Sequence, residues 1–91
     1  MLTVYSKTVC PHCIDAKNYL KSKNIPFREI DIEQDQEARE FIKSQGHRTV
    51  PQIYMHNKMF VEGGWTGLSK MTDEDIFNEM ELRDSLVSGT L

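Results

Sequence analysis

Apolar and polar positions follow two different periods over the first twenty residues. Residues 2–6 alternate between apolar and polar side chains and are rich in residues that favour strands, which predicts a strand with Leu2 and Val4 facing the core. From Cys13 the apolar positions recur every three to four residues, which predicts a helix. Pro11 suits the first turn of that helix, because a missing N–H is tolerated there. The strand therefore leads directly into the helix, and two cysteines lie at the junction.

The next part of the chain repeats this succession of strand and helix. Residues 24–26 (Asn-Ile-Pro) end the first helix, and residues 27–32 predict a second strand with β-branched and aromatic side chains. A second helix is expected over about residues 36–45, with Gly46 as its left-handed cap. Its apolar face consists of Ala38, Phe41 and Ile42.

A hairpin and a last helix complete the pattern. Short apolar runs at residues 53–55 and 59–61 predict two strands, with Asn57 taking a positive φ in the turn between them. Thr72 and Asp75 have capping-box spacing and precede a helix. The expected apolar stripe of that helix is Ile76, Phe77 and Met80. The predicted order is β-α-β-α-β-β-α, an α/β fold.

Length and composition predict one small domain covering residues 1–91. The chain is 38% hydrophobic with a formal net charge of −3, which gives no reason to expect a nucleic-acid partner. No stretch is long and apolar enough for a membrane span or a signal-peptide core. We expect a cytoplasmic monomer with no membrane partner, and residues 85–91 to be its least ordered part.

Cys10 and Cys13 predict redox chemistry. Three residues apart, they would close only a tiny loop, which is a poor staple for an extracellular protein. A helix N-terminus favours a thiolate at Cys10, and Lys7 adds a nearby cation. Two roles stay open for His12, a modest electropositive influence on Cys10 or a solvated surface side chain. Cys13 is one helical turn further in and is expected to be more buried. Cys10 is therefore predicted as the attacking thiolate, and Cys13 as its resolving partner.

A structural zinc site is the alternative for a C-x-x-C pair, because such a pair supplies half of the ligands. The remaining candidates are His12, His47 and His56. His12 lies inside the cysteine pair, and the other two belong to different predicted elements without ligand-like spacing. The redox interpretation is favoured, no bound metal is expected, and we assign His47 and His56 no role.

Four segments of the chain, in the same order, resemble the dithiol glutaredoxins. They are residues 5–13 (YSKTVCPHC), 30–31 (ID), 49–53 (TVPQI) and 63–64 (GG). Together they cover residues 1 to about 68, and their joint order is more specific than any one of them. The chain is similar to a compact member of the C-P-x-C type, of the kind found in phages and bacteria.

This resemblance implies a thioredoxin fold with a four-stranded mixed sheet flanked by helices. It also implies a cis peptide bond before Pro51, facing the dithiol, and glutathione as a co-substrate, with no bound cofactor. The physical argument agrees, because cis bonds are nearly confined to proline and the Val50 backbone could pair with an extended peptide. The implied glutathione contacts are Lys7, His12, Thr49, Val50, Pro51, Gly64, Trp65 and Thr66.

The chain departs from the family pattern after the paired glycines. Many glutaredoxins have a small and an acidic residue there, whereas this chain has Trp65 and Thr66. Three functions are weighed on that basis. The first is a glutathione-dependent reductase of disulfide-containing proteins, with ribonucleotide reductase as a family-typical acceptor. The second is a redoxin reduced by thioredoxin reductase, and the third is an iron–sulfur carrier in which glutathione and Cys10 of two chains hold the cluster.

Overall fold

The structure of the protein is a computed structural model that describes residues 1–88. Its first half runs β1 (Leu2–Ser6), α1 (Pro11–Ser22), β2 (Phe27–Asp31) and α2 (Gln36–Ser44). The second half adds β3 (Gln52–Met55), β4 (Lys58–Val61), α3 (Gly64–Leu68) and α4 (Asp73–Ser88). None of the helices in this described part is long and apolar enough to cross a membrane.

The four strands form one mixed sheet in the order β2-β1-β3-β4. β1 pairs with β2 in parallel and with β3 antiparallel, and β3 pairs antiparallel with β4. The parallel β1–β2 pair is connected through α1, and the antiparallel β3–β4 pair is a hairpin, as these two kinds of connection require. The predicted four-stranded mixed sheet and thioredoxin fold are confirmed.

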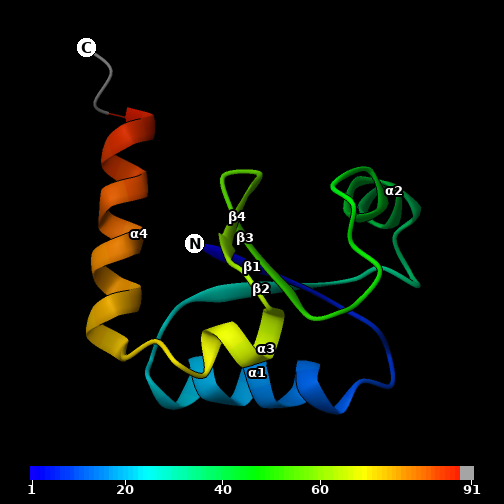
Figure 1. The fold of residues 1–91 in the computed structure, drawn as a ribbon, viewed down its shortest axis with the longest axis horizontal. Coiled ribbons are helices and arrows are strands. Elements are labelled where there is room, and N and C mark those ends of the chain that lie inside the picture. Colours follow the sequence, from blue (N-terminus) through cyan, green and yellow to red (C-terminus); the bar gives the residue numbers. More distant parts are fainter. Residues whose placement is uncertain (89–91) are drawn as a thin grey trace.

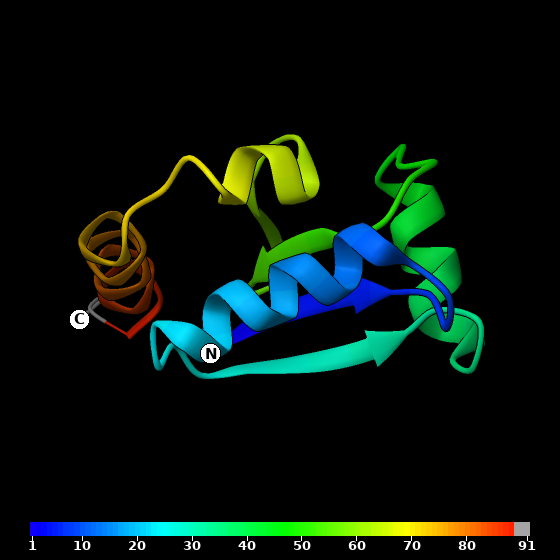
Figure 2. The ribbon, with the colours of Figure 1, turned by 90° about the horizontal axis from the view of Figure 1, so that it is seen from below.

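Helices cover both faces of the sheet. Figure 1 shows α1 and α3 together on one side, and α2 on the opposite side. Figure 2 shows α4 at one end of the molecule and α2 at the other. The larger core cluster contains Leu2 and Val4 with side chains from α1, α3 and α4. The smaller cluster, beneath α2, contains Tyr5 and Tyr54. All five residues of β1 are therefore buried, not only Leu2 and Val4.

Turn and cap residues adopt the conformations that their sequence predicts, with one change. Gly46 has a φ of 85° after α2. The hairpin turn consists of His56 and Asn57, with φ values of 54° and 63°. It is thus a two-residue turn, and β4 begins at Lys58, whereas the sequence predicted a three-residue separation.

The last helix starts as predicted but presents a narrower apolar stripe. Thr72 and Asp75 exchange backbone-to-side-chain hydrogen bonds of 3.1 Å each. Ile76 and Met80 are buried, but Phe77 is 45% exposed, so the prediction for Phe77 was wrong. One helical step of about 100° turns it away from the core. Residues 85–88 continue α4, and residues 89–91, the rest of the segment expected to be the least ordered, lie outside the described part.

The short helix α3 is absent from the predicted order. The paired glycines before it were interpreted as a simple break in the chain. Gly63 and Gly64 do have positive φ values, 82° and 56°, but the chain then turns into five helical residues. A Cβ on Gly67 would come closer than 3.0 Å to the Glu62 carbonyl oxygen. Glycine at this position therefore allows α3 to pack tightly against the end of β4.

Candidate active site

The loop from β1 to α1 is held by hydrogen bonds to the end of β2 and the segment that follows it. The Thr8 hydroxyl donates to Asp31 Oδ2 at 2.7 Å, and the Thr8 backbone N–H donates to Glu33 Oε1 at 3.0 Å. The Glu33 N–H in turn donates to Asp31 Oδ1 at 2.8 Å. These bonds hold the residues just before Cys10 and so position the start of α1.

Cys10 is the N-cap residue of α1. It has an extended backbone conformation, and its Sγ accepts a hydrogen bond from the Cys13 N–H at 3.2 Å. The unpaired N–H groups of a helix start and the positive end of its dipole stabilise negative charge. The sulfur of Cys10 therefore lies where a thiolate is favoured, at the place that the sequence predicted.

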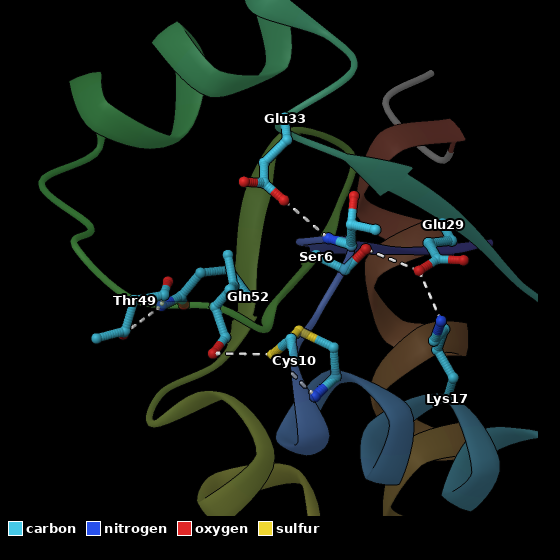
Figure 3. Close-up of a disulfide and its surroundings, with 10 residues drawn as sticks. Ser6, Cys10, Lys17, Glu29, Glu33, Thr49 and Gln52 are labelled. Carbon is cyan, nitrogen blue, oxygen red and sulfur yellow. Dashed lines mark hydrogen bonds and ion pairs between the residues drawn. A yellow bond between two sulfur atoms is a disulfide. The ribbon is translucent and has the colours of Figure 1, made fainter.

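Cys10 and Cys13 form a disulfide, with Cα atoms 5.2 Å apart, so the structure represents the oxidised protein (Figure 3). Cys10 retains 9% exposure and Cys13 only 1%. The order of exposure agrees with the predicted roles, although Cys10 is less open than expected. Of the two sulfurs, that of Cys10 is the more accessible to a substrate.

Pro51 and Gly64 form the wall that faces the disulfide. The Val50–Pro51 peptide bond is cis, as the resemblance implied. The Val50 carbonyl oxygen lies 3.8 Å from Cys10 Sγ. Gly64, the first residue of α3, approaches Pro51 closely. A Cβ on Gly64 would come within 3.0 Å of the Pro51 carbonyl oxygen. Glycine thus brings two backbone segments together beside the reactive sulfur.

A cavity of about 510 Å³ is located along this wall. Seven of the eight residues predicted to contact glutathione line it: His12, Thr49, Val50, Pro51, Gly64, Trp65 and Thr66. The sequence reasoning missed Glu62, which brings a carboxylate to the same cavity. Its position directly before the paired glycines was the available signal.

Lys7, the eighth predicted contact, lines a neighbouring pocket of about 120 Å³. Thr49 and Val50 line this pocket as well, so the two cavities share one edge. The other basic side chains of the smaller pocket are Arg39, Lys43 and Arg48, none of which the sequence reasoning singled out.

An ion pair between Lys17 of α1 and Glu29 of β2 lies to one side of the disulfide (Figure 3). Lys17 Nζ and the Ser6 hydroxyl both donate to Glu29 Oε2, each at 2.7 Å. These hydrogen bonds hold the pKa of Glu29 below its ordinary value of 4.5, and the bond from Lys17 has the larger effect. Glu29 is therefore ionised at neutral pH and joins β1, β2 and α1 beneath the site.

The two remaining histidines have partners away from the cysteines. His47 Nε2 lies 2.6 Å from the Tyr54 hydroxyl oxygen, and burial raises the pKa of Tyr54. His56 Nε2 lies 2.7 Å from Asp84 Oδ1 at the far end of the hairpin. Within residues 1–88, no three His, Cys, Asp or Glu side chains are grouped so that they could hold a metal ion.

Comparison with known proteins agrees with this geometry. The glutaredoxin family model matches residues 2–61. Glutaredoxin 1 of Rickettsia conorii is 42% identical over 59 residues, which is 62% of this chain and 58% of that relative. The matched segment thus spans less than two thirds of the relative. Because the family model covers more than half of the chain, the protein belongs to the glutaredoxin family.

Two solved structures show the same fold. The crystal structure of a buckwheat glutaredoxin–glutathione complex matches with a TM-score of 0.69 and 23% identity, covering 89% of this chain and 76% of the other. The glutaredoxin-like protein NrdH-redoxin from Escherichia coli matches with a TM-score of 0.61 and 22% identity, covering 85% of this chain and 91% of the other. Both similarities concern the fold alone.

Proposed function

We propose that this protein is a glutathione-dependent thiol–disulfide oxidoreductase that reduces protein disulfides and glutathione mixed disulfides. One observation carries the proposal: Cys10, the more exposed of the two cysteines, caps a helix, and its Sγ lies 3.8 Å from the carbonyl oxygen of Val50, a residue that lines a cavity of about 510 Å³. A stabilised thiolate next to an open backbone edge is suited to attack the disulfide of a peptide.

The reductive half of the reaction begins with the Cys10 thiolate. It attacks one sulfur of the substrate disulfide, that S–S bond breaks, and the other sulfur leaves as a thiolate and takes up a proton. Cys13 then loses its proton and attacks the Cys10 sulfur of the mixed disulfide. The second substrate thiol is released, and the Cys10–Cys13 disulfide of the structure remains.

Two glutathione molecules then return two electrons. The thiolate of the first attacks Cys10, forms a mixed disulfide with it and releases Cys13 as a thiol. The second attacks the sulfur of the bound glutathione and leaves with it as glutathione disulfide, which restores the Cys10 thiolate. On a glutathione mixed disulfide, Cys10 alone can complete the cycle because glutathione itself resolves the intermediate.

The two neighbouring cavities together offer groups that match both ends of glutathione. The Val50 backbone can pair with the extended tripeptide, and Lys7 can bind a carboxylate. Thr66 and the carboxylate of Glu62, both on the larger cavity, are suited to the ammonium of the γ-glutamyl end. The buckwheat relative, which is described as a glutathione complex, supports this assignment. We expect disulfide-containing proteins, with ribonucleotide reductase as one family-typical candidate, to be the acceptors.

A redoxin reduced by thioredoxin reductase is the second candidate. Thr66 stands where many glutaredoxins have an acid, which weakens recognition of glutathione. The NrdH-redoxin, which has this fold, is described as having a thioredoxin-like activity profile.

A coupled assay distinguishes the two candidates by following NADPH oxidation while the protein reduces a disulfide substrate. One arm contains glutathione and glutathione reductase, and the other contains thioredoxin reductase. We expect turnover in the first arm and none above background in the second. Turnover in the second arm alone would refute the glutathione proposal.

A further inference from the structure

Four basic side chains surround the pocket of about 120 Å³ beside the active site: Lys7, Arg39, Lys43 and Arg48. We call them the basic rim. The ion pairs found among residues 1–88 use Lys17, Lys23, His56 and Arg83 as their cations, and no member of the basic rim takes part in one. Within the described chain, the positive charge of the rim is therefore not engaged in an ion pair of 4.0 Å or less.

This concentration of charge does not stabilise the fold. Arg39 and Lys43 are four residues apart on α2, so they are neighbours on one face of the helix, where like charges repel. The protein as a whole has a formal net charge of −3, whereas this pocket is lined by four lysine or arginine side chains and by no Asp or Glu. The other lining residues are His47 and four uncharged ones, Ile32, Ile42, Thr49 and Val50.

The position of the rim connects it to the reactive sulfur. Val50 lines both cavities, and its carbonyl oxygen lies 3.8 Å from Cys10 Sγ. A substrate segment that pairs with the Val50 backbone would therefore reach Cys10 and the rim at once. An extended chain advances about 3.3 Å per residue, so the rim would contact side chains within a few residues of the substrate cysteine.

We propose that the basic rim docks acidic side chains that flank the reactive cysteine of a disulfide-bearing protein substrate. The occupant is an extended segment with Asp or Glu next to its cysteine. Charge complementarity accelerates encounter and selects among substrates more than it adds affinity. The inference rests on the proposed function only in that Cys10 must attack a substrate disulfide, and it holds whichever reductant later restores the dithiol.

The test is a single-turnover measurement with the full chain, reduced beforehand and freed of reductant. Its substrates are two disulfide peptides that differ only in having Asp and Glu, or Asn and Gln, beside the cysteine. At low ionic strength we expect a roughly tenfold larger second-order rate constant for the acidic peptide, which added salt should diminish. No glutathione is present, so failure of the glutathione proposal leaves this result untouched.

A charge-reversal variant, Arg39→Glu with Lys43→Glu, should abolish the preference for the acidic peptide. The milder Arg39→Gln with Lys43→Gln should reduce it, and circular dichroism of each variant verifies folding. The matched control is Lys58→Glu with Lys70→Glu, which changes the net charge equally at two exposed lysines outside the rim and its pocket. Equal rate constants for the two peptides, or an equal loss of preference in the control, would overturn the proposal. If neither peptide is reduced, the docking proposal is refuted together with the proposed attack of Cys10 on substrate disulfides.

Discussion

Replacing Gly64 with alanine is expected to destabilise the wall of the cavity that faces Cys10. Two separate penalties arise there. Gly64 has a φ of 56°, a left-handed conformation that costs an alanine about 1–2 kcal/mol. The new Cβ would also come within 3.0 Å of the Pro51 carbonyl oxygen, a separation that Cβ atoms essentially never show. Relieving such a clash by moving backbone typically costs about 1–3 kcal/mol.

Two other glycines separate these penalties. Gly46 has a φ of 85° with nothing within 4 Å of an added Cβ, and Gly63 has a φ of 82° with its nearest neighbour at an ordinary 3.4 Å. Gly46→Ala and Gly63→Ala should therefore show only the conformational cost of about 1–2 kcal/mol. Gly64→Ala should lose about 2–5 kcal/mol, a large part of the stability of a small domain.

Urea unfolding of the oxidised proteins, followed by circular dichroism, measures all three variants under the same conditions. In Gly64→Ala, the displaced wall should also raise the Michaelis constant for glutathione, because Gly64 and Pro51 line its proposed cavity. If Gly64→Ala costs no more than the two control variants, α3 does not approach Pro51 as closely as the structure shows. The reasoning about this wall would then be wrong.

Three further predictions concern acidic groups and their replacements. Glu29→Gln should lower the free energy of unfolding at neutral pH by less than about 1 kcal/mol, since this pair is partly exposed. The pKa of Glu29 is lowered in the folded protein, so the difference in the free energy of unfolding between the original protein and Glu29→Gln should be fully present above pH 4.5 and disappear as the pH falls through that folded pKa. Urea titrations at several pH values can test this. Glu62→Gln should raise the Michaelis constant for glutathione with little change in turnover at saturation, and an unchanged constant would remove Glu62 from the ligand site. Thr66→Asp should lower that constant by roughly five- to tenfold, because a charge-assisted hydrogen bond replaces a neutral one; a constant that does not fall would favour the thioredoxin-reductase alternative.

The sequence predicted the elements whose side chains repeat with a clear period. The alternation in β1 and the three-to-four spacing in α1 are such cases. β1 begins at Leu2, as predicted, and α1 has Pro11 in its first turn, as predicted. The helix α3 escaped because five residues that include two glycines show no helical period. Its existence depends on a close backbone approach to β4, which only the folded chain brings about.

The same distinction applies to the candidate site. The dithiol and most of the cavity lining follow from short motifs, so they were predicted residue by residue. Arg39 and Lys43 lie on a helix face that, in sequence, cannot be told from ordinary solvated surface. Only the packing of α2 next to the segment around Val50 makes them neighbours of Lys7. Their four-residue spacing was the available signal, and it is meaningful only once α2 is placed.

The most direct test of the central claim is to trap glutathione on the attacking sulfur. Cys13→Ser leaves Cys10 as the one cysteine of the chain, and Cys10→Ser leaves Cys13. After each reduced variant is incubated briefly with glutathione disulfide, intact-protein mass spectrometry counts the adducts. We predict rapid, nearly complete glutathionylation of Cys13→Ser, and little in Cys10→Ser, whose remaining cysteine, Cys13, is 1% exposed in the oxidised protein. An adduct that forms equally fast in both variants, or only in Cys10→Ser, would contradict the assignment of Cys10 as the nucleophile.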